Sequence, residues 1–308
     1  MNKKAGGRKK FTFVHLFRNA FLESRRHDPL KTAAATAFFT SFALPPILLI
    51  LFQLFGLFMG KRLVGREMFE SITDTFGQLG AQQIVQTARG FNSLAQNWYI
   101  TIGGFVFLIF VATTLFTVIK NSFNQIWGVS THKAKGLLSN LKARARSFAI
   151  ILAAGILFVT GILIDSLELI AGKFMRELWS TAGAYFEGAL NEVAGTVIVT
   201  AWFIVLFRYL ADARPSWKVA IVGGVVTGVL YTLGKELLSL LMRNSNVVTI
   251  YGASGSIVLI LLFVFYSSFI LYFGAGFIKV YSEYIQQPLR LINNAYRYEI
   301  RVISEHPD

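Results

Sequence analysis

The feature that most constrains this chain is a series of long apolar runs. A helix needs about 20 apolar residues to cross the hydrocarbon core of a membrane, and a spanning segment must satisfy its own backbone hydrogen bonds, which excludes open sheets. Only 15% of the residues are charged, against about 25% in soluble domains. We therefore predict an all-α polytopic membrane protein with six transmembrane helices, over 32–59, 99–119, 147–169, 193–210, 218–241 and 256–278.

The distribution of basic residues predicts the orientation of these helices. The net charge is +14, and 22 of the 30 Lys and Arg residues lie in or next to four alternate segments: 1–31, 120–146, 211–217 and 279–308. Positive residues remain on the cytoplasmic side during insertion. We predict a multi-pass membrane protein with both termini cytoplasmic. It has a basic N-terminal segment over 1–31, a transmembrane domain over 32–278 and a tail over 279–308.

The basic residues favour contact with lipid over contact with nucleic acid. Each charge near an anionic membrane surface is worth about 1 kcal/mol. The alternative is that the basic residues bind a dedicated RNA or protein partner. We expect no nucleic acid to bind. The candidates for headgroup contact precede the third span: Lys133, Lys135, Lys142, Arg144 and Arg146.

Amphipathic helices are predicted on both sides of the membrane. Phe13, Phe17 and Phe21 recur among the N-terminal charges at near-helical spacing, which indicates an interfacial helix leading into the first span. On the outer side, apolar residues of 60–98 recur at three- and four-residue intervals. Two short helices there could lie along the membrane face or cap a cavity.

Pro45 and Pro46 lie inside the first predicted span. Because proline has no amide hydrogen, the carbonyls of Ser41 and Phe42 lose their usual helical partners. Two interpretations stay open. The prolines produce a packing kink, or they break the helix so that free carbonyls and Ser41 line a polar cavity or a hinge.

Polar residues also follow one face of the second predicted helix. Thr113, Thr117, Asn121 and Asn124 are separated by steps of four, four and three. Threonine hydroxyls can bond to their own helix, whereas the asparagines lie at the cytoplasmic end. We predict a polar seam that faces the bundle interior and is a candidate substrate path.

Ionisable residues inside spans point to function in membrane proteins. Asp165 and Glu168 lie three apart near the outer end of the third span, and Lys235 and Glu236 lie toward the outer end of the fifth. Our hypothesis is that Lys235 pairs with Asp165 or Glu168 across the bundle. The alternative is that all four side chains reach the outer headgroups.

Rows of small residues predict close approach of helix backbones. Gly224 and Gly228 form such a row in the fifth span, one turn after Ala220, and Ala33 and Ala37 begin another in the first. Packing inside the bundle is the simpler interpretation, and a dimer interface is the alternative.

The residues that support catalysis are absent or scattered. There is no cysteine, which excludes thiolate chemistry and thiolate-bound metals. The four histidines lack metal-ligand spacing, there is no phosphate-binding loop, and cytoplasmic acids such as Asp212 and Glu283 are scattered. We therefore expect no enzymatic activity, no metal and no cofactor.

Three segments together carry a resemblance to a known family. They read AAATAFFTSFALPP over 33–46 after Asp28-Pro29, NSFNQIWGV over 121–129, and YGASGSIVLILLFVFYSSFILYFGAGF over 251–277. With the six-span layout they resemble the YihY/BrkB membrane family, once labelled ribonuclease BN, over residues 10–290. Family members commonly read Gly-Ala-Glu-Phe where this chain has Gly-Ala-Gly276-Phe. If that glutamate has a function in the family, a neighbouring residue such as Lys279 or Glu283 would have to perform it in this chain.

The resemblance implies a protein of the bacterial inner membrane with a role in the cell envelope, including serum resistance and the export of lipid A precursors or other anionic lipids. The residues give the ribonuclease label no support. We expect a transporter-like protein that binds or moves an anionic lipid, with membrane lipids, a second copy or an envelope protein as partners. The alternatives are a non-transporting scaffold or regulator and a transporter of a small soluble solute.

Overall fold

A computed structural model describes residues 13–59, 98–131, 180–244, 255–292 and 295–298, with scattered positions between 65 and 86 and at 149, 153 and 156. The described part is mostly helical, as predicted. The helices are α1 (Phe13–Arg25), α2 (Pro29–Met59), α4 (Trp98–Ile126), α6 (Ser180–Tyr209), α7 (Trp217–Asn244) and α9 (Gly255–Tyr284). The strands are β1 (Val129–Thr131), β2 (Ala213–Arg214), β3 (Arg290–Leu291) and β4 (Ala295–Arg297).

Five of the six predicted spans coincide with long helices, namely α2, α4, α6, α7 and α9. Within the described residues, Trp217–Leu238 and Ile257–Tyr284 are long and apolar enough to cross a membrane, and Val193–Tyr209 is a shorter apolar helix. The third predicted span lies outside the described residues except at 149, 153 and 156. The count of six spans therefore stays a prediction.

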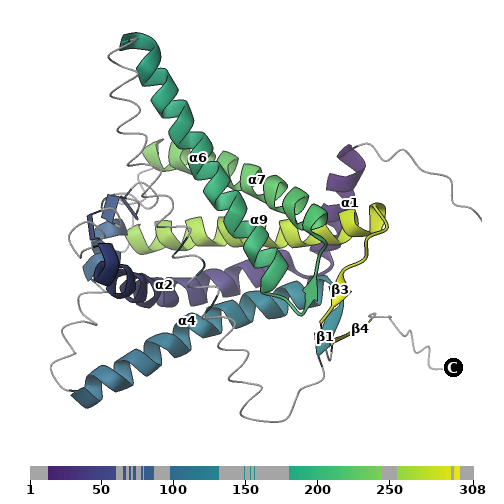
Figure 1. The fold of residues 1–308 in the computed structure, drawn as a ribbon, viewed down its shortest axis with the longest axis horizontal. Helices are drawn as coiled ribbons and strands as arrows, with labels where there is room; N and C mark the ends of the chain where they lie inside the picture. The colour runs from purple at the N-terminus through teal and green to yellow at the C-terminus, as the bar shows by residue number, and fades with distance from the viewer. Residues whose placement is uncertain are drawn as a thin grey trace, which may run out of the picture.

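Helix α9 lies at the centre of the bundle. It packs against α1, α2 and α7, while α6 packs on α7 and α4 packs on α2. In Figure 1, α4 and α6 lie on opposite sides of α9 and diverge away from the strands. The helices come together at the end where the strands lie, which we call the convergent end.

Two small antiparallel sheets close the convergent end. Strand β1 pairs with β4, and β2 pairs with β3. The pairs bring together three segments that the charge distribution assigns to one side of the membrane, 129–131, 213–214 and 290–297. The sheets themselves were not predicted, because strands of two or three residues are too short to show an alternating pattern.

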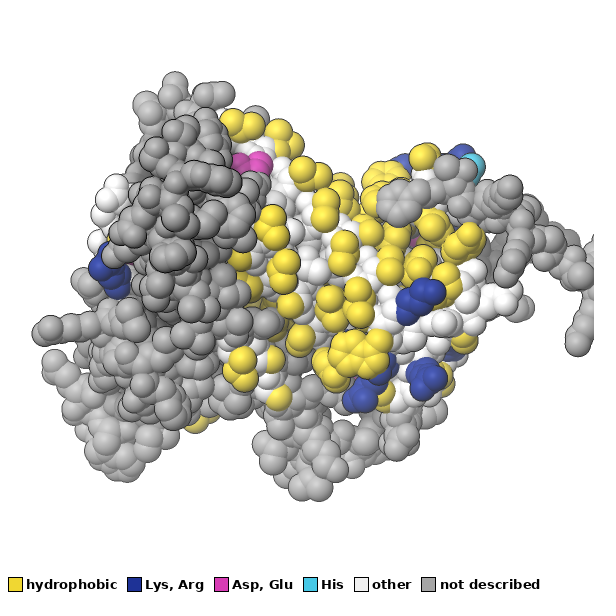
Figure 2. All heavy atoms as spheres, turned by 45° about the horizontal axis from the view of Figure 1, so that its top comes forward, with side chains coloured by type: hydrophobic (Ala, Val, Ile, Leu, Met, Phe, Trp, Pro, Cys, Tyr) yellow, Lys and Arg dark blue, Asp and Glu magenta, His cyan; other side chains and the backbone are white. Residues whose placement is uncertain are grey.

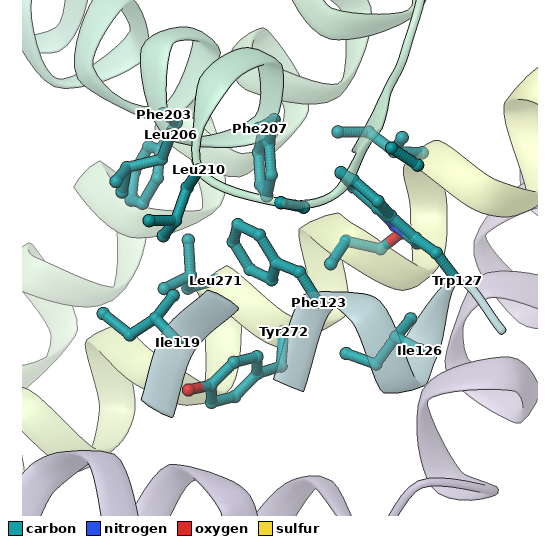
Figure 3. Packing of buried hydrophobic residues seen from close by; sticks show 14 of the residues in the cluster. Ile119, Phe123, Ile126, Trp127, Phe203, Leu206, Phe207, Leu210, Leu271 and Tyr272 are labelled. Atoms are coloured by element: carbon teal, nitrogen blue, oxygen red, sulfur yellow. The ribbon is translucent and has the colours of Figure 1, made fainter. Parts of the chain in front are cut away.

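Aromatic side chains fill the centre of the convergent end (Figure 3). Phe123 of α4 is fully buried, with its ring centroid 5.4 Å from that of Phe207 on α6 and 6.2 Å from that of Tyr272 on α9. It also stacks on Trp127 at 5.6 Å. This packing joins the ends of α4 and α6 to the side of α9.

The described residues between 65 and 86 pack onto the end of the bundle opposite the convergent end. The described positions between 65 and 86 are helical, and Ile72 and Ile84 are buried in one cluster with Ile260 and Phe263 of α9. The prediction of helices is confirmed at these positions, and their location on the outer side of the membrane stays a prediction. They cap the helices of the bundle.

One face of α7 exposes large apolar side chains at helical spacing. Figure 2 shows hydrophobic side chains over this side of the molecule, with Lys and Arg side chains at one end. Such a surface suits contact with lipid chains better than contact with water. The exposed residues of α7 are Ile221, Val225, Val229, Leu233, Leu237 and Leu240.

The glycine row of α7 faces α6, as the packing interpretation predicts. A Cβ at Gly224 would meet Ile204, and one at Gly228 would meet the side chain and Cα of Thr200. The two helices therefore approach closely inside the bundle, and these glycines are not left free to form a dimer interface.

Replacing Gly228 by alanine is expected to destabilise the protein by about 1–3 kcal/mol, because the added methyl group forces α6 and α7 apart. Gly195 on α6 provides the matched control, since a Cβ there meets nothing within 4 Å. Gly195→Ala should be neutral or stabilising, because alanine favours a helix over glycine. Unfolding by denaturant in mixed micelles measures the stability of both variants. Equal changes in stability would contradict the close packing of α6 on α7 at Gly228.

One prediction about the N-terminal helices is corrected. Helix α2 continues through Pro45 and Pro46 without a break, so the broken-helix interpretation is wrong. The N-terminal helix forms as predicted and packs on the bundle, with Leu16 and Ala20 buried against Phe277 of α9. Its position at the membrane interface stays a prediction.

Candidate functional site

The second and third family-like segments meet at the convergent end. The indole Nε1 of Trp127 donates a hydrogen bond to the carbonyl oxygen of Ala275 at 2.9 Å. Next to it, Gly128 has a φ of 63°, a conformation that glycine adopts without steric cost. Its carbonyl accepts a hydrogen bond from the amide of Tyr298 at 2.9 Å. Trp127 and Gly128 thus tie α4 to α9 and to the C-terminal strand.

Asp212 is the centre of a buried ionic cluster at the same end. It is 2% exposed and accepts a hydrogen bond from Asn124 Nδ2 at 2.8 Å. Its backbone amide donates to Asn124 Oδ1 at 2.9 Å, and Lys120 Nζ lies 2.9 Å from its carboxylate. The cluster joins α4 to the turn after α6. Sequence reasoning classed Asp212 as one of several scattered acids, because only the fold brings it to Asn124.

The predicted polar seam of α4 is only partly correct. Thr113 and Asn124 are buried, but Thr117 and Asn121 are exposed. Each step of four residues turns by about 400°, which is more than one full turn, so successive residues in such a row lie further and further around the helix. The Thr117 hydroxyl donates to the carbonyl of Thr113 at 2.8 Å, which satisfies it within its own helix. Thr117 and Asn121 do not line the bundle interior.

A polar crevice lies where the turn between α1 and α2 faces α4 and α9. Its lining includes hydroxyl, imidazole and amide groups from four elements. As packed, the crevice has no room for a water molecule, so it is closed in this structure. The lining residues are Ser24, His27, Pro29, Thr32, Ser122, Gln125, Ile126 and Tyr272.

Two buried hydroxyl groups mark the inner wall of this crevice. Tyr272 is fully buried and its hydroxyl lies 2.5 Å from Thr36 Oγ1 on α2. Ser24 is 3% exposed, and its Oγ has no hydrogen-bond partner among the described residues. A buried hydroxyl without a partner costs free energy, so the crevice retains hydrogen-bonding capacity for another group.

An ion pair holds α1 against α9 beside the crevice. Lys279 Nζ lies 2.5 Å from Glu23 Oε1, and His27 Nε2 lies 3.6 Å from the same oxygen. Burial acts to raise the pKa of Glu23, but its hydrogen bond to Lys279 and the charges of Lys279, Arg26 and His27 outweigh it and hold the pKa below 4.5. Burial, then the charge of Lys279, lowers the pKa of His27 below 6.5 despite the nearby Glu23 carboxylate.

The protein is expected to lose stability in two steps as the pH falls. Both groups have a lower pKa folded than unfolded, so the unfolded chain binds their protons first and gains relative to the fold on acidification. Loss begins below pH 6.5 through His27 and continues below pH 4.5 through Glu23. Melting temperatures of His27→Gln should lack the first step and keep the second. An unchanged profile would contradict this arrangement.

The structure also gives a reason for Gly276. A Cβ at this position would lie 3.2 Å from the carbonyl oxygen of Ala20 and 3.6 Å from Ser24. A glutamate side chain here would therefore run into α1. The carboxylate beside α9 comes from Glu23 instead, through its pair with Lys279. Glu283, the other predicted substitute, is exposed.

The remaining predicted site residues take no part in the Asp212 cluster or in the lining of the crevice. Ser41 donates to the carbonyl of Ala37 in its own helix at 2.9 Å. Lys235 is half-buried and Glu236 is exposed on α7. Asp165 and Glu168, the predicted partners of Lys235, lie outside the described residues, so that pairing stays a prediction. The five predicted headgroup contacts are outside them as well: Lys133, Lys135, Lys142, Arg144 and Arg146.

Comparisons with known proteins place these features in a family context. A family model described as "Virulence factor BrkB" matches residues 20–298, a range that holds all three family-like segments and the crevice. No solved structure matches the chain.

Several relatives carry the name "UPF0761 membrane protein". One from Saccharophagus degradans is 26% identical over 275 residues, 89% of this chain and 61% of the relative. One from Teredinibacter turnerae is 26% identical and covers 86% of this chain and 59% of the relative. One from Pseudomonas aeruginosa is 28% identical over 246 residues, which are 79% of this chain and 57% of the relative. The chain thus spans about three fifths of the length of these relatives.

Proposed function

Because this chain belongs to the BrkB family of membrane proteins, we propose that it binds an anionic lipid or a related amphipathic envelope precursor and moves it across the inner membrane. It does so without catalysis, and the polar crevice at the convergent end is where the headgroup enters. The proposal covers the membrane domain described here, which is shorter than the family relatives.

The observation that carries the proposal is the position of the crevice at the convergent end of an apolar surface. Pro29 and Thr32 of α2 line the crevice, and further along the same helix Phe38 and Phe42 are exposed at 55% and 61%. On α4, Phe107 is likewise 54% exposed. A lipid could keep its acyl chains against these side chains while its headgroup reaches the polar groups.

The chemistry of the crevice suits an oxygen-rich headgroup. The hydroxyl of Ser24 has no hydrogen-bond partner among the described residues, and Thr32, Ser122 and Gln125 add polar groups. Phosphate and sugar oxygens accept hydrogen bonds from hydroxyl and amide donors. Since the crevice is closed as packed, transport requires α2 and α4 to separate here.

A reversible cross-link tests this proposal. The chain contains no cysteine, so Thr32→Cys and Gln125→Cys introduce two reactive thiols, one on each wall of the crevice. A short disulfide-linked cross-linker would hold α2 to α4. We expect transfer of a fluorescent anionic lipid in reconstituted vesicles to stop on cross-linking and to resume on reduction. The single-cysteine variants, treated alike, should be unaffected.

Two results would refute the proposal. One is an absence of transfer by the unmodified protein above protein-free vesicles. The other is transfer that proceeds at the same rate in the cross-linked and reduced double variant, since lipid would then pass elsewhere.

A second candidate function is a non-transporting scaffold or regulator of the envelope. It is supported by the dense aromatic packing around Phe123, which fills the centre of the convergent end. A scaffold would show no lipid transfer and would copurify with a defined envelope protein.

A further inference from the structure

A basic and aromatic cluster lies on the convergent end away from the crevice, where α6 ends and α7 begins. Tyr209 and Trp217 are exposed, with ring centroids 6.3 Å apart. Aromatic residues of this kind favour the level of lipid headgroups. The cluster's cations come from four elements: Arg208 of α6, Arg214 of β2, Lys218 of α7 and Arg290 of β3.

Two of these cations face each other directly. In the β2–β3 pair, Arg214 is the register partner of Arg290, and both are exposed. Side chains of opposed residues in an antiparallel pair start about 5 Å apart, and like charges there are destabilising. Among the described residues, no ion pair joins either arginine to a carboxylate. An anion between them would offset the repulsion.

Arg208 adds an independent sign of a missing acceptor. Its guanidinium donates to the carbonyl of Pro215 and stacks over Trp217, with Cζ 5.1 Å from the ring centroid. Its Nε is buried and has no hydrogen-bond partner in the described part of the chain. A donor on a charged group that is buried without an acceptor is costly. A ligand oxygen beside Trp217 would satisfy it after a small rotation of the side chain.

The cluster continues into an apolar surface. Starting one turn after Trp217, α7 exposes Ile221, Val225 and Val229 along one face. Figure 2 shows basic side chains at the end of the exposed hydrophobic surface. Positive charge, interfacial aromatic rings and an apolar strip are thus arranged in the order of headgroup, glycerol and acyl chains in a phospholipid.

We propose that this cluster is a binding site for the phosphate of an anionic glycerophospholipid of the inner leaflet, whose acyl chains lie on α7. Arg214 and Arg290 bind the phosphate, Trp217 contacts the glycerol region, and Arg208 positions Trp217. The site names the lipid class of the proposed function and rests on that proposal. It is separate from the crevice, so it gathers lipid at the surface before entry.

Binding by the full chain in neutral detergent tests the site. The probe is phosphatidylglycerol with a fluorophore on its acyl chain, followed by anisotropy, with labelled phosphatidylcholine for comparison. Arg214→Gln with Arg290→Gln should weaken binding of the anionic probe by at least about tenfold, since two attracting charges are lost. The matched control is Arg18→Gln with Lys31→Gln, which removes two exposed cations from α1 and α2 and should leave affinity nearly unchanged.

A stability measurement separates binding from folding. Without lipid, the Arg214/Arg290 double variant should melt at the same temperature as the parent protein or higher, because the like-charge pair is gone. Phosphatidylglycerol should then raise the melting temperature of the parent protein only.

Three outcomes would overturn the site. Equal loss of affinity in both double variants would mean that binding depends on the overall charge of the protein and not on this site. Equal affinity for phosphatidylcholine would remove the role of the headgroup charge. Displacement of the probe by millimolar inorganic phosphate would assign a soluble anion instead. Lipid transfer is read separately: specific binding without any transfer by the parent protein would refute the proposed function and leave this site intact.

Discussion

Replacing Phe123 by alanine is expected to lower the free energy of unfolding by about 3–5 kcal/mol. The ring is fully buried among Trp127, Phe207 and Tyr272, so its removal leaves a cavity where α4 and α6 end against α9. Phe123 lies beyond the predicted end of the second span, so magnitudes known from water-soluble cores apply. Denaturant unfolding in mixed micelles, followed by tryptophan fluorescence, measures the loss.

The matched control is Phe107→Ala on the same helix. Phe107 is 54% exposed, so its removal exchanges contacts with lipid or detergent and creates no cavity. We expect a change of less than about 1 kcal/mol there. Similar losses at both positions would contradict the view that the convergent end is the stable part of the bundle.

Replacing Asp212 by alanine is expected to destabilise the protein by a similar amount, about 3–5 kcal/mol. The substitution leaves Asn124 without its carboxylate partner and Lys120 as a partly buried charge without its counter-ion. The same unfolding measurement applies. Glu283→Ala removes an exposed acid near the same end and should change stability by less than about 0.5 kcal/mol.

A second substitution distinguishes a broken ion pair from general damage. Adding Lys120→Met to Asp212→Ala removes the unpaired cation and should restore part of the lost stability. Coupled residues show such non-additive effects, whereas independent ones do not. Strictly additive losses would mean that Lys120 and Asp212 do not act as a pair.

The sequence predicts the helices well because their signal is local. Long apolar runs such as 218–241 and 256–278 match α7 and α9 closely, since lipid permits few alternatives to a helix. The glycine row of α7 was interpreted correctly for the same reason. A row of small residues indicates a closely packed neighbouring helix, and in the structure that neighbour is α6.

The site was harder to predict because it depends on contacts between distant segments. Asn124 was singled out, but its partner Asp212 lies 88 residues away, and no local pattern marks that pair. Glu23, Ser24 and Tyr272 were not expected to act together. The one available signal was the tryptophan of the 121–129 segment, because a buried indole needs an acceptor. The exposure of Thr117 shows the converse, that polarity along a helix does not identify its buried face.

The most direct test of lipid handling is native mass spectrometry of the protein extracted gently from its own membrane. We predict that each chain retains an anionic lipid in fixed stoichiometry and that the lipid is lost when Arg214 and Arg290 are replaced together by glutamine. The same spectrum reports whether a second copy is bound. A chain that carries no lipid and a stoichiometric second polypeptide instead would contradict the account and favour the scaffold.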